Sequence, residues 1–274
     1  MKLGFGLYRH MLNREELRFA VQCGATHLVV HYVDYFNQSD GRNPRGDQPT
    51  GGLHGWGCAG DPENLWSVGE LTELRQLVES EGLVLYAIEN FDPAHWHDVL
   101  LDGPRKPEQL ENLKTIIRNV GAAGIHHFGY NFSLAGVYGR QKGAFARGGA
   151  ESVGLSGPMD HTPMPKGMVW NMTYNPELAG APGAEPDSRA LCTHEELWSR
   201  LNDFLEAVVP AAEAAGVVLA AHPDDPPLPT VRGTPPSRLS APHVSTPSRR
   251  KTKPEQWLGI LSRHPGRNER GKSL

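Results

Sequence analysis

The sequence predicts an α/β protein built as a partial (β/α)8 barrel, with about five to six barrel strands, long loop insertions and an irregular C-terminal tail. Short apolar runs alternate with amphipathic helical patterns, which is the order of parallel βαβ units. Polar residues gather where the predicted strands end, as on the functional face of such a barrel. No glycine-rich phosphate loop opens a helix, which disfavours the alternative of a doubly wound open sheet.

The first βαβ unit is predicted by two apolar runs with a capped helix between them. The runs are residues 3–8 and 27–32, and Asn13 occupies the N-cap position of the intervening helix. Gly24 ends this helix, and we expect Cys23 to be a buried apolar side chain on it. The helix face expected to be buried consists of Leu17, Ala20 and Val21.

The next unit begins after a long loop, residues 34–64, which lacks periodicity. A loop of this length is either functional or a surface insertion, and its His54, Trp56 and Cys58 are placed to reach over a site. A capping box at Ser67 and Glu70 then predicts a helix that ends at Gly82. The run 83–89 that follows is apolar on both faces until Glu89, as expected of a parallel strand covered on both sides.

The remaining elements lie on either side of an insertion, residues 133–189, in which 168–174 is the only segment expected to be ordered. A second capping box, at Thr193 and Glu196, marks the return of regular structure. The elements expected here are a helix at 107–123, a strand at 126–132, a helix from Thr193 to Gly216 and a strand at 217–219.

Composition narrows the class of protein. The chain has 274 residues and three widely spaced cysteines without a CxxC pair, so neither a disulfide framework nor a zinc knuckle is predicted. The first residues lack the features of a signal peptide, and no apolar run reaches the roughly 18 residues that span a bilayer. We therefore expect a cytoplasmic protein without membrane association.

The net charge of -4 conceals an asymmetry along the chain. Residues 231–274 contain ten Lys/Arg and two Asp/Glu, so this tail is near +8 and the preceding body near -12. A basic run such as 249–253 is compatible with nucleic-acid binding. The acidic body lacks an RNA-binding or helix-turn-helix pattern, and we therefore do not expect nucleic acid to be the partner.

The most informative stretch follows the strand at 217–219. There, His222, Asp224 and Asp225 emerge together between prolines, which prevent a helix from forming. A neutral imidazole beside clustered carboxylates suits a divalent-metal or acid/base site. The alternative is an ordinary helix cap by Asp next to a surface histidine.

These motifs resemble those of the mannonate dehydratase family, the sugar-acid lyases that belong with the xylose-isomerase-like TIM barrels. The resemblance covers about 3–235 and implies that residues 1–235 are an incomplete TIM-barrel catalytic domain. Its motifs are Gly24-Ala25-Thr26, Leu65-Trp66-Ser67-Val68, Gly129-Tyr130-Asn131-Phe132, Val209-Pro210-Ala211-Ala212-Glu213 and His222-Pro223-Asp224-Asp225-Pro226-Pro227.

The resemblance implies dehydration of D-mannonate to 2-keto-3-deoxy-D-gluconate in hexuronate catabolism, with Mn²⁺ or Fe²⁺ as Lewis acid. It implies a small sugar acid as substrate and makes a homodimer a possible assembly. His222 matches the family's first metal ligand, and Asp224 and Asp225 would orient its imidazole or contact substrate hydroxyls. The residues that would hold the polyol and its carboxylate are Glu89, Tyr130, Asn131 and Arg140.

Two of these residue assignments have structural alternatives, and the function has alternatives of its own. Tyr130 could be a packed aromatic residue, and Glu89 could belong to a structural ion pair. The same barrel could instead isomerise or epimerise a sugar. The chain could also be a non-catalytic remnant whose basic tail binds nucleic acid.

The sequence departs from the family after residue 235. There the family continues into strands that supply a cysteine, a second histidine and an aspartate to the metal, whereas 236–274 is a divergent basic tail that we expect to be disordered. We hypothesise a truncation or frameshift near this point. The expected consequences are weak metal binding, loss of activity and exposed sheet edges that promote aggregation.

Overall fold

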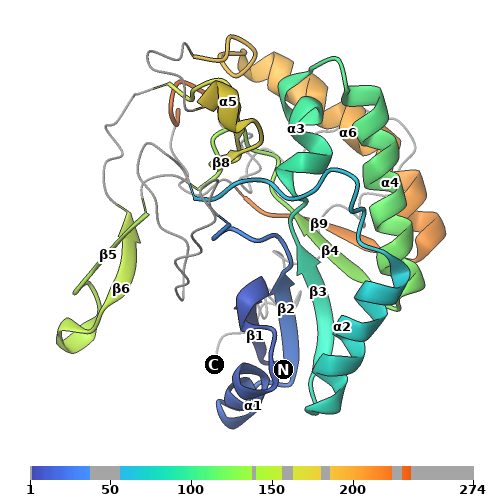
Figure 1. Ribbon diagram of the computed structural model, residues 1–274, viewed down its shortest axis with the longest axis vertical. Coiled ribbons are helices and arrows are strands. Elements are labelled where there is room, and N and C mark those ends of the chain that lie inside the picture. Colours follow the sequence, from blue (N-terminus) through green and yellow to red (C-terminus); the bar gives the residue numbers. More distant parts are fainter. Residues whose placement is uncertain are drawn as a thin grey trace, which may run out of the picture.

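A five-stranded parallel sheet forms the centre of the computed structural model, which describes residues 2–37, 56–137, 140–155, 163–179, 186–223 and 230–235. Its strands, in spatial order, are β1 (Gly4–Tyr8), β2 (His27–His31), β3 (Val84–Glu89), β4 (His127–Tyr130) and β9 (Val218–Ala221) (Figure 1). Chain order and spatial order coincide, without the reversal of a doubly wound sheet. The predicted barrel-type α/β class is confirmed, and the described strands make an open part of a barrel.

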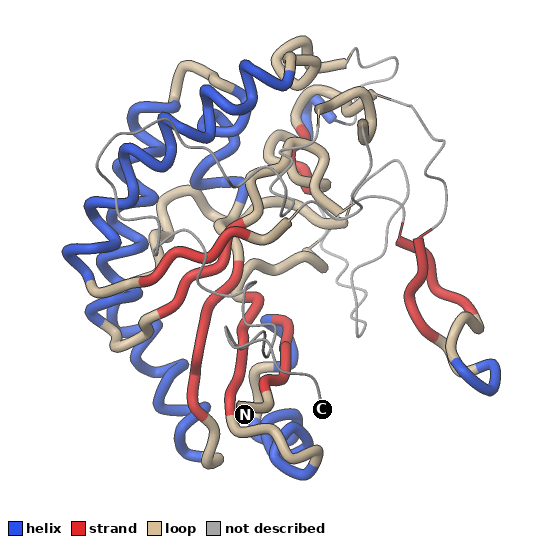
Figure 2. The backbone as a smooth tube through the Cα atoms, turned by 180° about the vertical axis from the view of Figure 1, so that it is seen from behind, coloured by secondary structure: helices blue, strands red, loops and turns tan. Residues whose placement is uncertain are grey.

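The helices are α1 (Arg14–Gln22), α2 (Val68–Ser80), α3 (Pro93–Leu101), α4 (Lys106–Ala122), α5 (Pro176–Ala179) and α6 (His194–Ala215). Among them α2, α4 and α6 lie along the same face of the sheet, as the two opposite views show (Figures 1 and 2). The other, inner face of the sheet is therefore the one available for a site. No helix in the described ranges is both long and apolar enough to cross a membrane.

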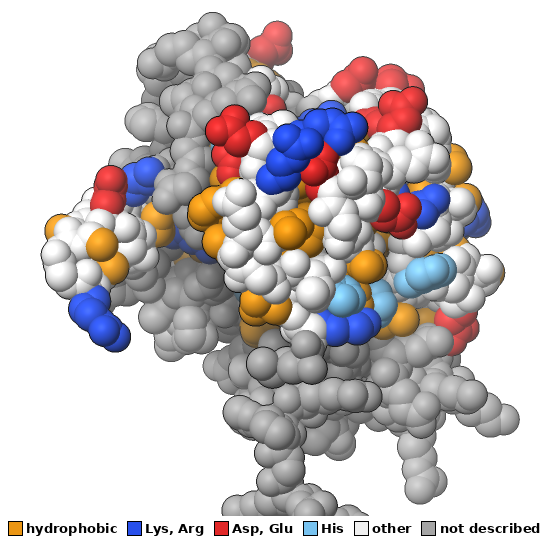
Figure 3. Space-filling view, turned by 90° about the horizontal axis from the view of Figure 1, so that it is seen from below, with side chains coloured by type: hydrophobic (Ala, Val, Ile, Leu, Met, Phe, Trp, Pro, Cys, Tyr) orange, Lys and Arg blue, Asp and Glu red, His pale blue; other side chains and the backbone are white. Residues whose placement is uncertain are grey.

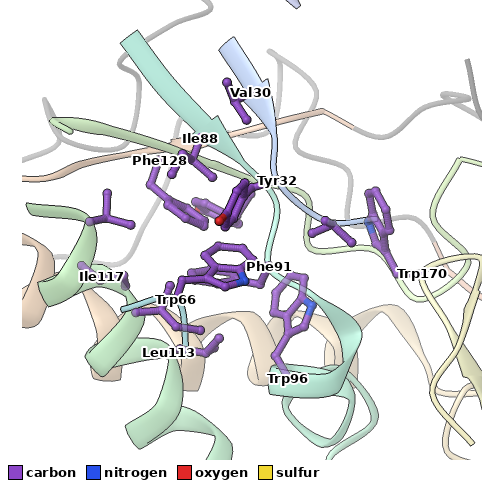
Figure 4. Close-up of a cluster of buried hydrophobic side chains, with 14 of the residues drawn as sticks. Val30, Tyr32, Trp66, Ile88, Phe91, Trp96, Leu113, Ile117, Phe128 and Trp170 are labelled. Carbon is purple, nitrogen blue, oxygen red and sulfur yellow. The ribbon is translucent and has the colours of Figure 1, made fainter. Parts of the chain in front are cut away.

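The main apolar core lies between the sheet and these helices. Val30, Ile88 and Phe128 project from three adjacent strands toward Leu113 and Ile117 of α4 (Figure 4). All five side chains are fully buried, so each contributes on the order of 1.5–3 kcal/mol of transfer free energy. This layer fixes which side of each strand faces the helices.

The two predicted capping boxes have different outcomes. At α6 the box is confirmed, because Thr193 Oγ1 accepts from the Glu196 N–H at 3.2 Å and Glu196 Oε2 accepts from the Thr193 N–H at 2.7 Å. At α2 only the Ser67 half forms, with its hydroxyl accepting from the Glu70 N–H. The Glu70 carboxylate accepts instead from the hydroxyl of the buried Tyr32, which competes with the Ser67 N–H for it.

Two predictions about the first helix are wrong. Cys23 is exposed at the C-cap of α1, and Val21 is 41% exposed. Of the expected face only Leu17 and Ala20 are buried, because the helix contacts the sheet over a narrow strip. The helix ends as predicted at Gly24, whose φ of 85° is a left-handed conformation that suits glycine.

The insertion contains more regular structure than the sequence predicts. The expected segment 168–174 forms the hairpin of β7 (Met168–Val169) and β8 (Met172–Thr173), but a second hairpin pairs β5 (Arg140–Gly143) with β6 (Ser152–Leu155). This second hairpin projects away from the sheet (Figure 1).

Helix α3, which lies before the insertion, is a further element that the sequence did not predict.

Candidate active site

Polar side chains line the carboxyl ends of the strands on the inner face. On β2, Leu28 and Val30 are buried against the helices, so the alternation of a strand directs His31 to the inner face. The parallel register places His31 between Tyr8 of β1 and Glu89 of β3. The last residues of three neighbouring strands therefore lie side by side at the carboxyl end of the sheet.

His31 and Glu89 form the centre of this group. Their Nε2 and Oε2 atoms are 3.8 Å apart, and both side chains keep about a fifth of their surface exposed (21% and 22%). The Tyr8 ring stacks on the imidazole with centroids 4.6 Å apart. Burial lowers the pKa of His31, and this effect outweighs the Glu89 charge that raises it, so the imidazole is neutral at pH 7.

Arg140 and His222 lie close to this pair. Both are near enough for their charges to lower the pKa of His31 further. Arg140 starts β5 and places its guanidinium over the Trp56 ring, 5.6 Å from the centroid. The first residue of the projecting hairpin therefore places a cation near the strand ends.

Asn131 and Tyr130 have different surroundings, although they are adjacent in the chain. Tyr130 is on the helix-facing side of β4, because its buried ring lies 5.2 Å from that of Phe204 on α6. Asn131 is also buried, and its Oδ1 atom has no hydrogen-bond partner in the described part of the chain. This placement favours packing for Tyr130 and leaves Asn131 with an acceptor that a bound hydroxyl could satisfy.

Sequence reasoning did not select several residues that complete this region. Asn90 and Asn171 have left-handed φ angles of 69° and 56°, and each buries an Oδ1 atom that has no hydrogen-bond partner within the described ranges. Asn90 donates through Nδ2 to the Tyr35 hydroxyl at 3.2 Å. The position of Asn90 directly after Glu89 at a strand end was a usable signal, whereas Asn171 lies in the insertion without one.

Aromatic rings form the wall beside these amides. Tyr35, Trp56 and Trp170 are buried and in mutual contact, with centroids between 5.3 and 5.5 Å apart. They join the segment after β2, the end of the long loop and the β7–β8 turn. Of the three loop residues expected over the site, Trp56 lies in this aromatic wall and His54 falls outside the described residues. Cys58 forms an isolated backbone β-bridge with Thr173.

His222 follows β9 and is oriented by its neighbours. Its N–H donates to the Tyr130 carbonyl at 2.7 Å, and its ring Nδ1 lies 2.6 Å from the Pro223 carbonyl oxygen. Because a carbonyl only accepts, Nδ1 carries the proton and Nε2 presents a lone pair. This is the tautomer and backbone contact typical of a metal-binding histidine.

The rest of a metal site is not provided by the described side chains. Within those ranges, no group of three or more His, Cys, Asp and Glu side chains could hold an ion. Asp224 and Asp225 fall outside the described residues. Among the described residues, His222 is therefore the single side chain placed to ligate a divalent ion.

A sequential parallel sheet with polar groups at its strand ends defines the class of (β/α) barrel proteins. The chain belongs to the mannonate dehydratase family, because the sequence model of D-mannonate dehydratase (UxuA) matches residues 48–240. The resemblance inferred from the motifs is thereby confirmed.

Curated relatives agree with this assignment. A mannonate dehydratase of Streptococcus pneumoniae is 35% identical over 173 residues, which are 59% of this chain and 45% of the relative. Mannonate dehydratase 1 of Bacillus licheniformis is 29% identical over 184 residues, or 61% of this chain and 48% of that protein. The chain thus spans about half the length of the curated relatives it matches.

The fold is also similar to that of a solved structure. The crystal structure of mannonate dehydratase from Streptococcus suis serotype 2 matches with a TM-score of 0.56 and 24% identity, over 86% of this chain and 57% of that one. At this identity the likeness shows the fold alone.

Proposed function

We propose that this chain is a mannonate dehydratase-like hydro-lyase that converts D-mannonate to 2-keto-3-deoxy-D-gluconate in the cytoplasm. The observation that carries the proposal is the gathering of His31, Glu89, Asn131 and His222 at the strand ends of a chain from this family. Dehydration removes a proton from C2 and the hydroxyl from C3, and it needs groups that bind a polyol and its carboxylate at one place.

The proposed roles follow from the chemistry of each side chain. Arg140 pairs with the substrate carboxylate, because its guanidinium donates two parallel hydrogen bonds. Glu89 and Asn131 hold hydroxyl groups. Tyr130 is proposed to pack beneath the site, since its ring lies against Phe204.

His222 is proposed to hold the divalent ion, Mn²⁺ or Fe²⁺, through Nε2. When bound, such an ion would act as a Lewis acid on the substrate carboxylate. Asp224 and Asp225 remain predicted partners of this imidazole or of substrate hydroxyls. The catalytic unit is proposed to be 1–235, and the assembly a homodimer.

The test is to incubate the purified chain with D-mannonate and Mn²⁺ and to measure the 2-keto-3-deoxy product. The proposed function requires turnover in the wild type and its loss in His222→Ala, whereas the divergent tail after residue 235 predicts no turnover. His126→Ala is the matched control, because His126 is an exposed histidine next to the amino end of β4.

The product also separates this proposal from an isomerase or epimerase on the same barrel. Dehydration lowers the mass of the sugar acid by one water, whereas isomerisation and epimerisation leave it unchanged. A folded wild-type chain that gives no product with Mn²⁺ or Fe²⁺ would reject the proposal.

A further inference from the structure

His31 and Glu89 are separated by a distance that one bound oxygen would bridge. The 3.8 Å between Nε2 and Oε2 is too long for a direct hydrogen bond. An oxygen atom beside both would form hydrogen bonds of ordinary length with each of them. Because both side chains retain exposed surface, a ligand can reach this position.

The protonation pattern of the pair is complementary to a hydroxyl group. The Nδ1 atom of His31 is buried without a hydrogen-bond partner among the described residues, and a buried N–H there would lose its hydrogen bond to water. The neutral ring therefore places its proton on Nε2, which becomes a donor, while the Glu89 carboxylate is an acceptor. A hydroxyl both accepts and donates, so it satisfies the two groups at once.

The pair is also held in place before any ligand binds. The Tyr8 ring stacks on His31 at an interplanar angle of 21°, and Tyr35 contacts the imidazole edge-on with centroids 6.0 Å apart. Glu89 lies over Gly129 of the adjacent strand, where the missing side chain leaves room for it. Side chains that are already restricted lose little conformational entropy when a ligand binds, so more of the interaction free energy is available to bind the ligand.

We propose that His31 and Glu89 form a hydroxyl-binding pair that selects the substrate by one secondary hydroxyl. The His31 Nε2–H donates to the hydroxyl oxygen, and the hydroxyl proton is donated to Glu89. The inference rests on the proposed function for the sugar-acid class of the ligand. A site built to bind a hydroxyl discriminates strongly against a ligand that lacks it, because its own polar groups are then left unpaired.

The experiment measures equilibrium binding by calorimetry, at fixed Mn²⁺, of D-mannonate and of its analogues that each lack one hydroxyl. The variants are His31→Phe, which keeps the ring against Tyr8 but removes the donor, and His31→Gln, which restores a donor. His27→Phe is the matched control, because His27 begins the same strand at its opposite end. Figure 3, which views the molecule from below, shows histidine side chains on the surface.

We expect His31→Phe to weaken D-mannonate binding about tenfold, the typical upper effect of one neutral hydrogen bond. One analogue should bind wild type and His31→Phe equally, since it lacks the hydroxyl that the pair holds. His31→Gln should recover part of the affinity, and His27→Phe should bind like wild type.

Three results would overturn the inference: an equal loss for every analogue, no loss for any ligand, or no binding of D-mannonate to the wild type. The first would show that His31 only maintains the structure or binds a water there. Selective binding without turnover would contradict the proposed function but support the hydroxyl-binding pair. Turnover with an equal loss of affinity for every analogue would support the proposed function but contradict the hydroxyl-binding pair.

Discussion

Gly129 lies directly beneath Glu89, so that a Cβ atom on residue 129 would come within 3.2 Å of Glu89 Cγ. The two residues are register partners on β4 and β3. The absence of a side chain at 129 therefore sets the position of the carboxylate. Since its φ angle is not in the left-handed region, the glycine is required by space and not by backbone conformation.

Gly129→Ala should displace Glu89 by a few tenths of an ångström while leaving the sheet folded. We expect D-mannonate affinity to fall about tenfold, because a shifted acceptor no longer shares a hydroxyl with His31. Calorimetry measures the affinity, and urea unfolding should show a change of about 1 kcal/mol or less. Gly6→Ala on β1 is the control, because a Cβ atom at that position would have nothing within 4 Å. Unchanged affinity in Gly129→Ala would contradict this account.

Stability should decrease as the pH falls below the ordinary histidine range. Unfolded His31 takes up a proton near pH 6.5, whereas burial lowers its pKa in the folded protein. Between the two pKa values the unfolded state binds more protons, so the free energy of unfolding falls with falling pH. Urea unfolding at about pH 7.5 and about pH 5.5 should show a smaller difference in His31→Phe than in wild type. An identical difference would mean that His31 does not contribute.

The capping box of α6 provides a test of helix stability away from the site. Thr193→Ala removes the hydroxyl that accepts from the Glu196 N–H, and we expect a loss of about 1 kcal/mol in the free energy of unfolding. Thr193→Ser keeps the hydroxyl and should stay close to wild type. Urea unfolding at neutral pH measures both. A loss of the same size in both variants would assign the effect to the Thr193 methyl group.

Tyr130 should contribute to stability and little to chemistry. Its ring packs on Phe204 on the helix side of the sheet, so Tyr130→Phe should keep turnover within about twofold of wild type. Tyr130→Ala should lose about 3 kcal/mol or more of stability, as for other buried aromatic residues. A large loss of turnover in a stable Tyr130→Phe would restore the catalytic role predicted from the sequence.

The sequence predicted the elements whose ends are marked by local chemistry. Gly24, Gly82, Gly124 and Gly216 each follow a helix with φ between 67° and 85°, and glycine adopts this conformation at no steric cost. The parallel class followed from the apolar runs between these glycines. Both kinds of signal are encoded within a few residues.

Helix α3 was missed because its signal is different. Nearly all of its side chains are buried, so it has no polar face and no helical periodicity. Its beginning was nevertheless visible, because Asp92 caps it through the Ala94 N–H and Pro93 occupies the first turn. Only packing from several sides explains the rest of this helix.

The sequence predicted which residues lie at the strand ends, but it did not predict which face of the sheet each side chain points to. Glu89, Asn131 and His222 follow apolar runs, and the structure places them at the same end of the sheet. That Tyr130 faces Phe204 follows from the register of β4, which the sequence analysis did not assign. Arg140 reaches the site through a hairpin that has no strand periodicity in the sequence.

The strand order has a consequence for how the chain folds. Strands β1, β2 and β3 each pair with the next strand in the sequence, whereas β9 joins β4 only after the excursion that contains both hairpins and α6. Closing so long a segment costs more chain entropy than forming any of the earlier pairs. The pairing of β9 with β4 therefore has the largest loop-closure cost in the sheet, and the position of His222 beside the other strand ends depends on that pairing.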